Sequence, residues 1–175
     1  DYFMCHTSSG TSFAVWDMRG GGDFETHDIT TELATATDIV GMAKIGDYLY
    51  VCAIDTSPVV NNVYRFDAKN IAAGGTIMTV GGTAIGTTVI VERMACDGKK
   101  LWFNNTGGDT ATTAHILRSY TIKGTVLTSD STVTNGATDA NFAFVAIDLH
   151  GNFYGYNSSD EKIRRHTFDG TLSAT

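Results

Sequence analysis

Proline and charged residues are scarce in this sequence. The 175 residues include one proline, Pro58, and only 18% are charged, whereas glycine occurs 19 times. Threonine, which favours strands, is plentiful, and glycine favours turns. The composition therefore favours an all-β protein. A compact chain of this length would bury roughly 70% of the surface exposed on unfolding, which is enough for a sizeable core.

Basic residues are too few and too scattered for a nucleic-acid surface. The net charge is −7, and the only adjacent basic pairs are Lys99-Lys100 and Arg164-Arg165. A phosphate backbone attracts a stripe of basic residues, so we expect no nucleic-acid partner. No apolar run approaches the roughly 18 residues of a membrane helix. We therefore expect no membrane insertion.

Standard catalytic and cofactor-binding strings are also missing. The sequence has no G-x-S-x-G, no H-E-x-x-H, no phosphate-binding loop and no EF-hand loop. The glycine-rich segment 81–86 does not have the G-x-G-x-x-G spacing, and we expect it to be a loop. These absences favour a non-catalytic protein, and we expect no cofactor.

The cysteines are odd in number and lack metal-ligand spacing. Cys5, Cys52 and Cys96 each lie in an apolar run. Cysteine packs as a small hydrophobe, which predicts three buried free thiols. A Cys5–Cys52 disulfide is the alternative.

A repeated unit is visible along the chain. Three segments begin with glycine and continue into an apolar, aromatic run: 46–51, 98–103 and 151–156. Leu49, Leu101 and Phe153 hold the same place in them, at intervals of 52 residues. Residues 1–5 align with 47–51 at an interval of 46. Repeats of about this length are typical of β-propellers.

Each unit carries further strand-like segments around this second strand. A preceding apolar strand is expected at 40–44, 93–96 and 144–147. A following strand is expected at 13–17, 63–67, 116–120 and 163–168. A polar, threonine-rich fourth strand is expected at 24–31, 76–80, 125–134 and 171–175. Inner strands lie between neighbouring blades and the outermost is an exposed edge, so this apolar-to-polar gradient predicts four-stranded blades.

The sequence thus predicts an all-β fold: a β-propeller of about four blades, each with four antiparallel strands. The domain would span residues 1–175 as a single propeller domain or segment, in four units: 1–37, 38–88, 89–139 and 140–175. The first unit lacks its innermost strand, so we expect an incomplete ring. It would be part of a larger propeller or be completed by another chain, because repeats with uncovered apolar faces are unstable.

The last unit carries a family resemblance. Its segments 148–154, Asp-Leu-His-Gly-Asn-Phe-Tyr, and 168–170, Phe-Asp-Gly, resemble the NHL-type repeat and the related lactonase and streptogramin-lyase-like propellers. Segment 97–103 is a looser copy. The resemblance covers about 50 residues well and implies a propeller fold, which serves scaffolds, sensors and enzymes alike.

The candidate binding residues follow the second strand of each unit, where polar side chains gather. They are Asp55, Asn104, Asn105, Asp109, Asn157, Asp160 and Glu161. Loops on one face of a rigid scaffold commonly carry binding residues, and amides and carboxylates suit a sugar, a peptide or Ca²⁺. The alternative is that these residue types are simply those of which turns are made.

Histidines and aromatic residues give weaker functional signals. The five histidines fall at different positions of the repeat, so they are not expected to converge on a metal or a catalytic site. The recurring aromatics are Trp16, Tyr50, Trp102 and Tyr154. Their phase in the repeat favours packing between blades over stacking on a sugar.

We therefore expect a non-catalytic β-propeller interaction or structural module of an extracellular, cell-surface or virion assembly. Its partners would be other proteins or further copies of itself, with glycans as a further class. The alternatives are a lactonase-type or lyase-type propeller enzyme with an axial metal or histidine, and a multivalent carbohydrate-binding lectin, in which several weak sites supply avidity.

Overall fold

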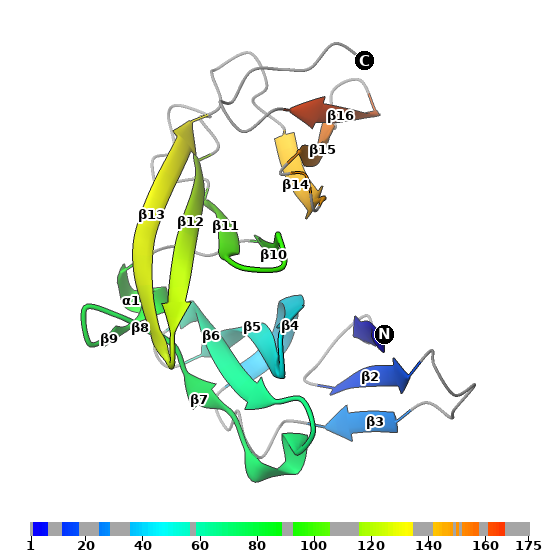
Figure 1. Cartoon of the computed structure of the whole chain (residues 1–175), viewed down its shortest axis with the longest axis vertical. Coiled ribbons are helices and arrows are strands. Elements are labelled where there is room, and N and C mark those ends of the chain that lie inside the picture. The colour runs from blue at the N-terminus through cyan, green and yellow to red at the C-terminus, as the bar shows by residue number, and fades with distance from the viewer. Residues whose placement is uncertain are drawn as a thin grey trace.

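Strands dominate the chain, and they form several antiparallel sheets (Figure 1). The computed structural model describes residues 2–6, 12–17, 25–28, 36–56, 59–88, 93–105, 116–134, 142–148, 150, 152–157 and 161–166. The expected all-β class is confirmed at this level. Helical structure in the described residues is limited to the 3₁₀ turn η1 (Ile71–Ala73) and the short helix α1 (Ile85–Thr88).

Four sheets follow one another along the chain. The first contains β1 (Tyr2–His6), β2 (Ser12–Asp17) and β3 (Glu25–Asp28). The second contains β4 (Ala36–Ile45), β5 (Tyr48–Thr56), β6 (Val59–Asp67) and β7 (Thr76–Ile77). The third contains β10 (Arg93–Cys96), β11 (Leu101–Asn105), β12 (Ile116–Lys123) and β13 (Val126–Thr134), followed by the short strands β8 (Thr79–Val80) and β9 (Thr83–Ala84) at its edge. The fourth contains β14 (Phe142–Ile147), β15 (Phe153–Asn157) and β16 (Lys162–His166).

The second strand of each unit has the same register in the last three sheets. Leu49 pairs with Phe66, Leu101 with Tyr120, and Phe153 with His166. In the first sheet Phe3 pairs with Trp16 at the corresponding place. Among the described residues, the strands expected from the sequence are thus present, apart from the strand at 76–80; the segment 171–175 lies outside the described residues.

The four sheets are arranged as an open arc (Figure 1). The strands β1, β4, β10 and β14 lie on its concave side, and β3, β7, β13 and β16 lie farther out. The first and last sheets are at the two ends of the arc. The described residues form no closed ring.

Consecutive sheets are joined by hydrophobic cores. Phe13 of the first sheet packs in one cluster with Leu49 and Val51 of the second. Cys52 and Val63 of the second sheet pack in another cluster with Leu101 and Phe103 of the third. The third and fourth sheets meet through an edge-to-face contact between Trp102 and Phe153, whose ring centroids are 5.1 Å apart. Each sheet is therefore held by its neighbours along the chain.

Strand β5 is buried on both faces, as its continuous apolar sequence predicts. Leu49, Val51 and Ala53 face the first sheet, whereas Tyr50 and Cys52 face the third. All five are at most 2% exposed. Its neighbour β4 approaches β10 closely at Gly41, where an added Cβ would lie 3.2 Å from Cβ of Met94.

The expected strand at 76–80 is wrong as a single element. Its first half, β7, belongs to the second sheet, and its second half, β8 (Thr79–Val80), belongs to the third. Met78 lies between them, is fully buried and donates its N–H to the Val63 carbonyl at 2.7 Å. The loop expected at 81–86 is wrong in part, because Gly81 and Gly82 turn β8 into β9 (Thr83–Ala84), which leads into α1.

Two of the three cysteines lie among the described side chains, and both are free thiols. Cys52 is buried, as expected, and the Cys5–Cys52 disulfide is therefore excluded. Cys96 is only partly buried, and this burial raises the pKa of its thiol. Cys5 lies in β1, outside the described side chains. No helix in the described part of the chain is long and apolar enough to cross a membrane.

Alternation along β13 gives a test of the packing between the second and third sheets. Leu127 is 1% exposed within their shared core, whereas the adjacent Val126 is 44% exposed. We expect Leu127→Ala to lower the free energy of unfolding by about 2–5 kcal/mol, since it leaves a cavity. Val126→Ala should change it by less than about 0.5 kcal/mol. Urea denaturation measures both, and equal effects would contradict this packing.

Candidate functional site

Asp55, the first of the expected binding residues, is buried near the end of β5. Its side chain is 3% exposed, and its Oδ2 accepts hydrogen bonds from Nδ2 of Asn62 at 2.5 Å and from the Tyr64 hydroxyl at 2.8 Å. The Oδ1 of Asn62 in turn accepts the N–H of Gly86 at 3.0 Å. Asp55 thus connects two strands of the second sheet and, through Asn62, the start of α1.

The other expected binding residues are placed as follows. Asn104 and Asn105 are the last residues of β11, and Asn157 ends β15, so their backbones belong to the sheets. Glu161 is exposed and has a positive φ of 57° in the turn before β16. Asp109 and Asp160 lie outside the described residues. Of the seven, only Asp55 has a described side-chain contact, and binding by the set stays a prediction.

Removal of the Asp55 carboxylate tests its part in the fold. We expect Asp55→Ala to lower the free energy of unfolding by at least about 2 kcal/mol, because each buried donor left without an acceptor costs about 1–3 kcal/mol. Asp47→Ala is the control, since this exposed carboxylate only pairs with exposed Lys69. Thermal or urea unfolding compares the two. An Asp55→Ala protein as stable as the control would contradict the structural role.

A carboxylate also organises the turn between β14 and β15. Oδ1 of Asp148 accepts the N–H groups of His150 and Asn152, both at 2.9 Å. Its Oδ2 accepts Nδ2 of Asn152 at 2.7 Å and the Tyr154 hydroxyl at 3.1 Å. The side-chain and backbone hydrogen bonds of Asn152, with those of His150 and Tyr154, lower the pKa of Asp148 to about 2.

Asp97 has the same role in the turn between β10 and β11. Its Oδ1 accepts the N–H groups of Lys99 and Lys100, and its Oδ2 accepts Nε1 of Trp102 at 3.0 Å. Partial burial acts to raise the pKa of Asp97, but the hydrogen bonds from Trp102 and the backbone outweigh it, so the pKa is lowered. The repeat expected from sequence contained both aspartates, and the acidic residue before each turn was the signal for this role.

The depressed pKa of Asp148 predicts a loss of stability in acid. The ordinary pKa is 3.8 and the folded value is about 2, so this contribution is complete above about pH 4 and disappears as the pH falls through 2. In Asp148→Asn the amide oxygen can still accept the backbone N–H groups. The amide NH₂ group, however, would face the Asn152 and Tyr154 donors and offers them no acceptor. We expect this variant to be less stable at pH 7, with the difference from the wild type closing towards pH 2.

Thermal unfolding between pH 7 and pH 2 measures this difference. Asp67→Asn is the control, because Asp67 is exposed and its one described side-chain hydrogen bond, from the N–H of Lys69, can be accepted equally by an amide oxygen. A difference between Asp148→Asn and the wild type that is the same at every pH would contradict the role of the Asp148 charge.

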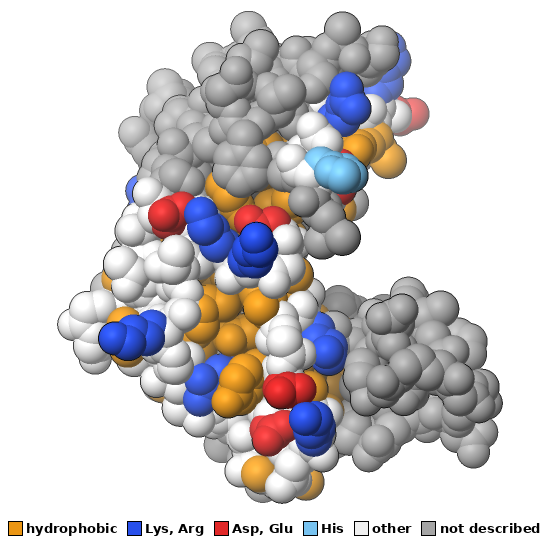
Figure 2. Space-filling model, in the orientation of Figure 1, with side chains coloured by type: hydrophobic (Ala, Val, Ile, Leu, Met, Phe, Trp, Pro, Cys, Tyr) orange, Lys and Arg blue, Asp and Glu red, His pale blue; other side chains and the backbone are white. Residues whose placement is uncertain are grey.

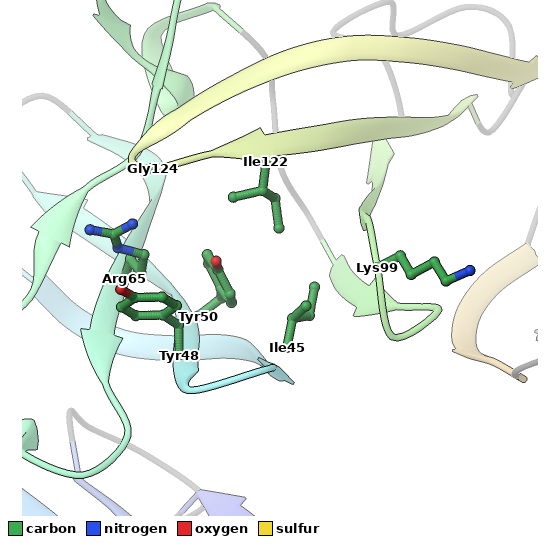
Figure 3. Close-up of a pocket in the computed structure, with 7 residues that line it drawn as sticks. All are labelled: Ile45, Tyr48, Tyr50, Arg65, Lys99, Ile122 and Gly124. Atoms are coloured by element: carbon green, nitrogen blue, oxygen red, sulfur yellow. The ribbon is translucent and has the colours of Figure 1, made fainter.

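A shallow groove lies between the second and third sheets. It has a volume of about 250 Å³ and is lined by Ile45, Tyr48, Tyr50, Arg65, Lys99, Ile122 and Gly124 (Figure 3). It is at the end of the sheets where the first and second strands are joined. Because neighbouring strands are antiparallel, the loops that follow the second strands lie at the opposite end. The groove is therefore separate from the binding residues expected from sequence.

Aromatic and basic side chains give the groove its chemistry. The Arg65 guanidinium carbon lies 4.4 Å from the centre of the Tyr48 ring, which is 40% exposed. Burial raises the pKa of Tyr50, an effect that Arg65 opposes and Tyr48 reinforces. The Lys99 side chain extends away from both tyrosines (Figure 3). The groove thus offers an apolar wall with one nearby guanidinium.

Hydrophobic side chains are also exposed near the middle of one face of the molecule, with acidic and basic side chains around them (Figure 2). Tyr50 and Trp102, in contrast, are at most 2% exposed and pack between sheets, which confirms the packing expected for them. Tyr154 is half-buried, and the side chain of Trp16 lies outside those described.

Within the described residues, no three His, Cys, Asp or Glu side chains lie together in a cluster that could hold a metal ion. His150 is exposed in the turn after Asp148, and the side chains of the other four histidines lie outside those described. No protein family matches the chain, and no curated protein or solved structure is significantly similar to it.

Proposed function

We propose that the chain forms consecutive blades of a β-propeller and serves as an interaction or structural module. Each of the four sheets would be one blade, with β4, β10 and β14 as inner strands near the axis and β3, β7 and β13 towards the rim. The NHL-type resemblance of segment 148–154 agrees with this architecture. The proposal extends beyond the observed open arc to a ring with an undetermined number of blades.

The observation that carries this proposal is the recurrence of one interface. Leu49, Leu101 and Phe153 have equivalent positions in the register, and they are 1%, 0% and 1% exposed. Each belongs to a cluster shared with the preceding sheet. A sandwich would not require the same contact at every 52-residue step, whereas a propeller does, since each blade packs on the one before it.

Polar groups of the chain support an interaction module over an enzyme. The carboxylates of Asp55, Asp97 and Asp148 all accept hydrogen bonds from the chain itself. They stabilise strand ends and turns and so are engaged in the architecture. What the scaffold then offers to partners is the surface of its sheets and loops.

The enzyme and lectin alternatives remain hypotheses that purified protein can test. A propeller enzyme of the lactonase or lyase type would turn over a lactone or glycoside and would contain a stoichiometric divalent metal or a reactive histidine. A lectin would respond to a glycan array, and the groove beside Tyr48 would suit a small ring. We expect no turnover, no stoichiometric metal and no glycan signal at millimolar monosaccharide.

The measurements are metal analysis, a panel of lactone and glycoside substrates, and the glycan array. Circular dichroism on the same sample confirms that the protein is folded. Turnover that persists through purification and is lost on metal removal would show that the protein is an enzyme and not a non-catalytic module.

A further inference from the structure

Each sheet has two faces, which we name by chain order. The back face packs on the preceding sheet and the forward face packs on the following one. In the second sheet, the forward face includes Ala43, Tyr50 and Val63, which are 4%, 2% and 0% exposed. In the first sheet, Phe13 has the place of Val63 and is also 0% exposed.

The fourth sheet has the same forward face, but its described side chains are more accessible. Ile163 pairs with Tyr156, which is the register position at which Val63 pairs with Cys52 in the second sheet. Ile163 is 64% exposed. Ala146 pairs with Tyr154 as Ala43 pairs with Tyr50, and Ala146 is exposed.

Tyr154 shows the same change at a third position. It is half-buried, whereas its equivalents Tyr50 and Trp102 are at most 2% exposed. Its hydroxyl is bonded to Asp148 as the indole N–H of Trp102 is bonded to Asp97, so the face is already formed. Three equivalent positions thus change from buried to accessible at the last sheet.

Within the chain, an equivalent forward face is covered by the sheet that follows it. The forward face of the second sheet is covered by the back face of the third, which contributes Leu101 at the start of its second strand. The first sheet has Phe3 at this place in the register, opposite Trp16. No described sheet precedes it, and it lies at the other end of the arc (Figure 1).

The charges of the two end sheets are complementary. The strands of the fourth sheet contain Lys162, Arg164 and Arg165 and no acidic residue. The strands of the first sheet contain Asp17, Glu25 and Asp28 and no lysine or arginine. Strand alternation places Arg165, which pairs with Tyr154, on the forward face of the fourth sheet, and Asp28, which pairs with Ser12, on the back face of the first. These two faces would therefore attract each other, and the forward faces of two fourth sheets would repel each other.

We propose that the forward face of the fourth sheet, formed by Ala146, Tyr154 and Ile163, binds the first sheet of a second copy of this chain. The contact continues the interface that joins the sheets within the chain, so it rests on the proposed function. It is heterologous, because different surfaces of the two copies meet, and such contacts either close a ring or extend into a longer assembly.

The test is the native mass of the 175-residue protein, measured by light scattering over a wide range of concentrations. We expect a mass that rises above the monomer with concentration. We also expect association to weaken at high salt, because charges at the rim are screened. Ile163→Asp should weaken association at least about tenfold, since it places a carboxylate in the apolar contact. Val126→Asp, at another exposed β-branched aliphatic residue, is the control and should associate like the wild type.

A charge variant distinguishes head-to-tail contact from contact between two fourth sheets. Asp28→Lys changes only the back face of the first sheet, so it should weaken association if that face is the partner and leave it unchanged otherwise. Circular dichroism establishes that each variant is folded.

A folded protein that stays monomeric at every concentration would overturn the proposal, as would association that Ile163→Asp does not weaken. Association that is weakened by Ile163→Asp but not by Asp28→Lys would assign the forward face of the fourth sheet to another occupant, and this result would also overturn the proposal. None of these results is turnover or metal binding, so failure here is distinguishable from failure of the proposed function.

Discussion

A sheet with two apolar faces cannot bury either face by itself, and this constraint governs the whole structure. Strand β5 is apolar almost throughout, and it is buried only because the first sheet lies on one side and the third on the other. The favourable free energy of burial, roughly 25 cal/mol per Å² of apolar surface, therefore comes from contacts between sheets. Each sheet depends on a neighbour, and among the described residues the first and fourth sheets each pack on one other sheet only.

The aspartate turns make this packing reproducible from one sheet to the next. In the third and fourth sheets, one carboxylate oxygen holds backbone N–H groups of the turn and the other holds the aromatic side chain of the forward face. Turn geometry and the direction of Trp102 or Tyr154 are thus coupled through a single residue. The second sheet uses another solution, a tight turn with Gly46 at a φ of 59°, and its Tyr50 is held by packing.

Polar residues near the second strands show how a candidate site changes when the fold is known. Asp55 follows an apolar strand and resembles a loop residue in the sequence, but β5 continues to Thr56, and Asp55 is buried beneath Asn62 and Tyr64. The groove beside Tyr48 could not be anticipated, since it combines residues from two sheets about 50 positions apart in the chain. Periodicity reports which face a residue occupies, and the partner on that face is set by the arrangement of the sheets.

The sequence by itself determined the strands, their order within each unit and the 52-residue register, because alternation, turn glycines and burial on both faces are local properties. It did not determine the division of 76–80 between two sheets, since that depends on Met78 finding a place in the core between them. Only the tertiary structure decided which forward faces are covered. Ile163 and Val63 are similar in sequence and equivalent in register, yet one is 64% exposed and the other 0%. The difference arises because burial of a sheet face depends on the sheet beside it, which the residue itself does not encode.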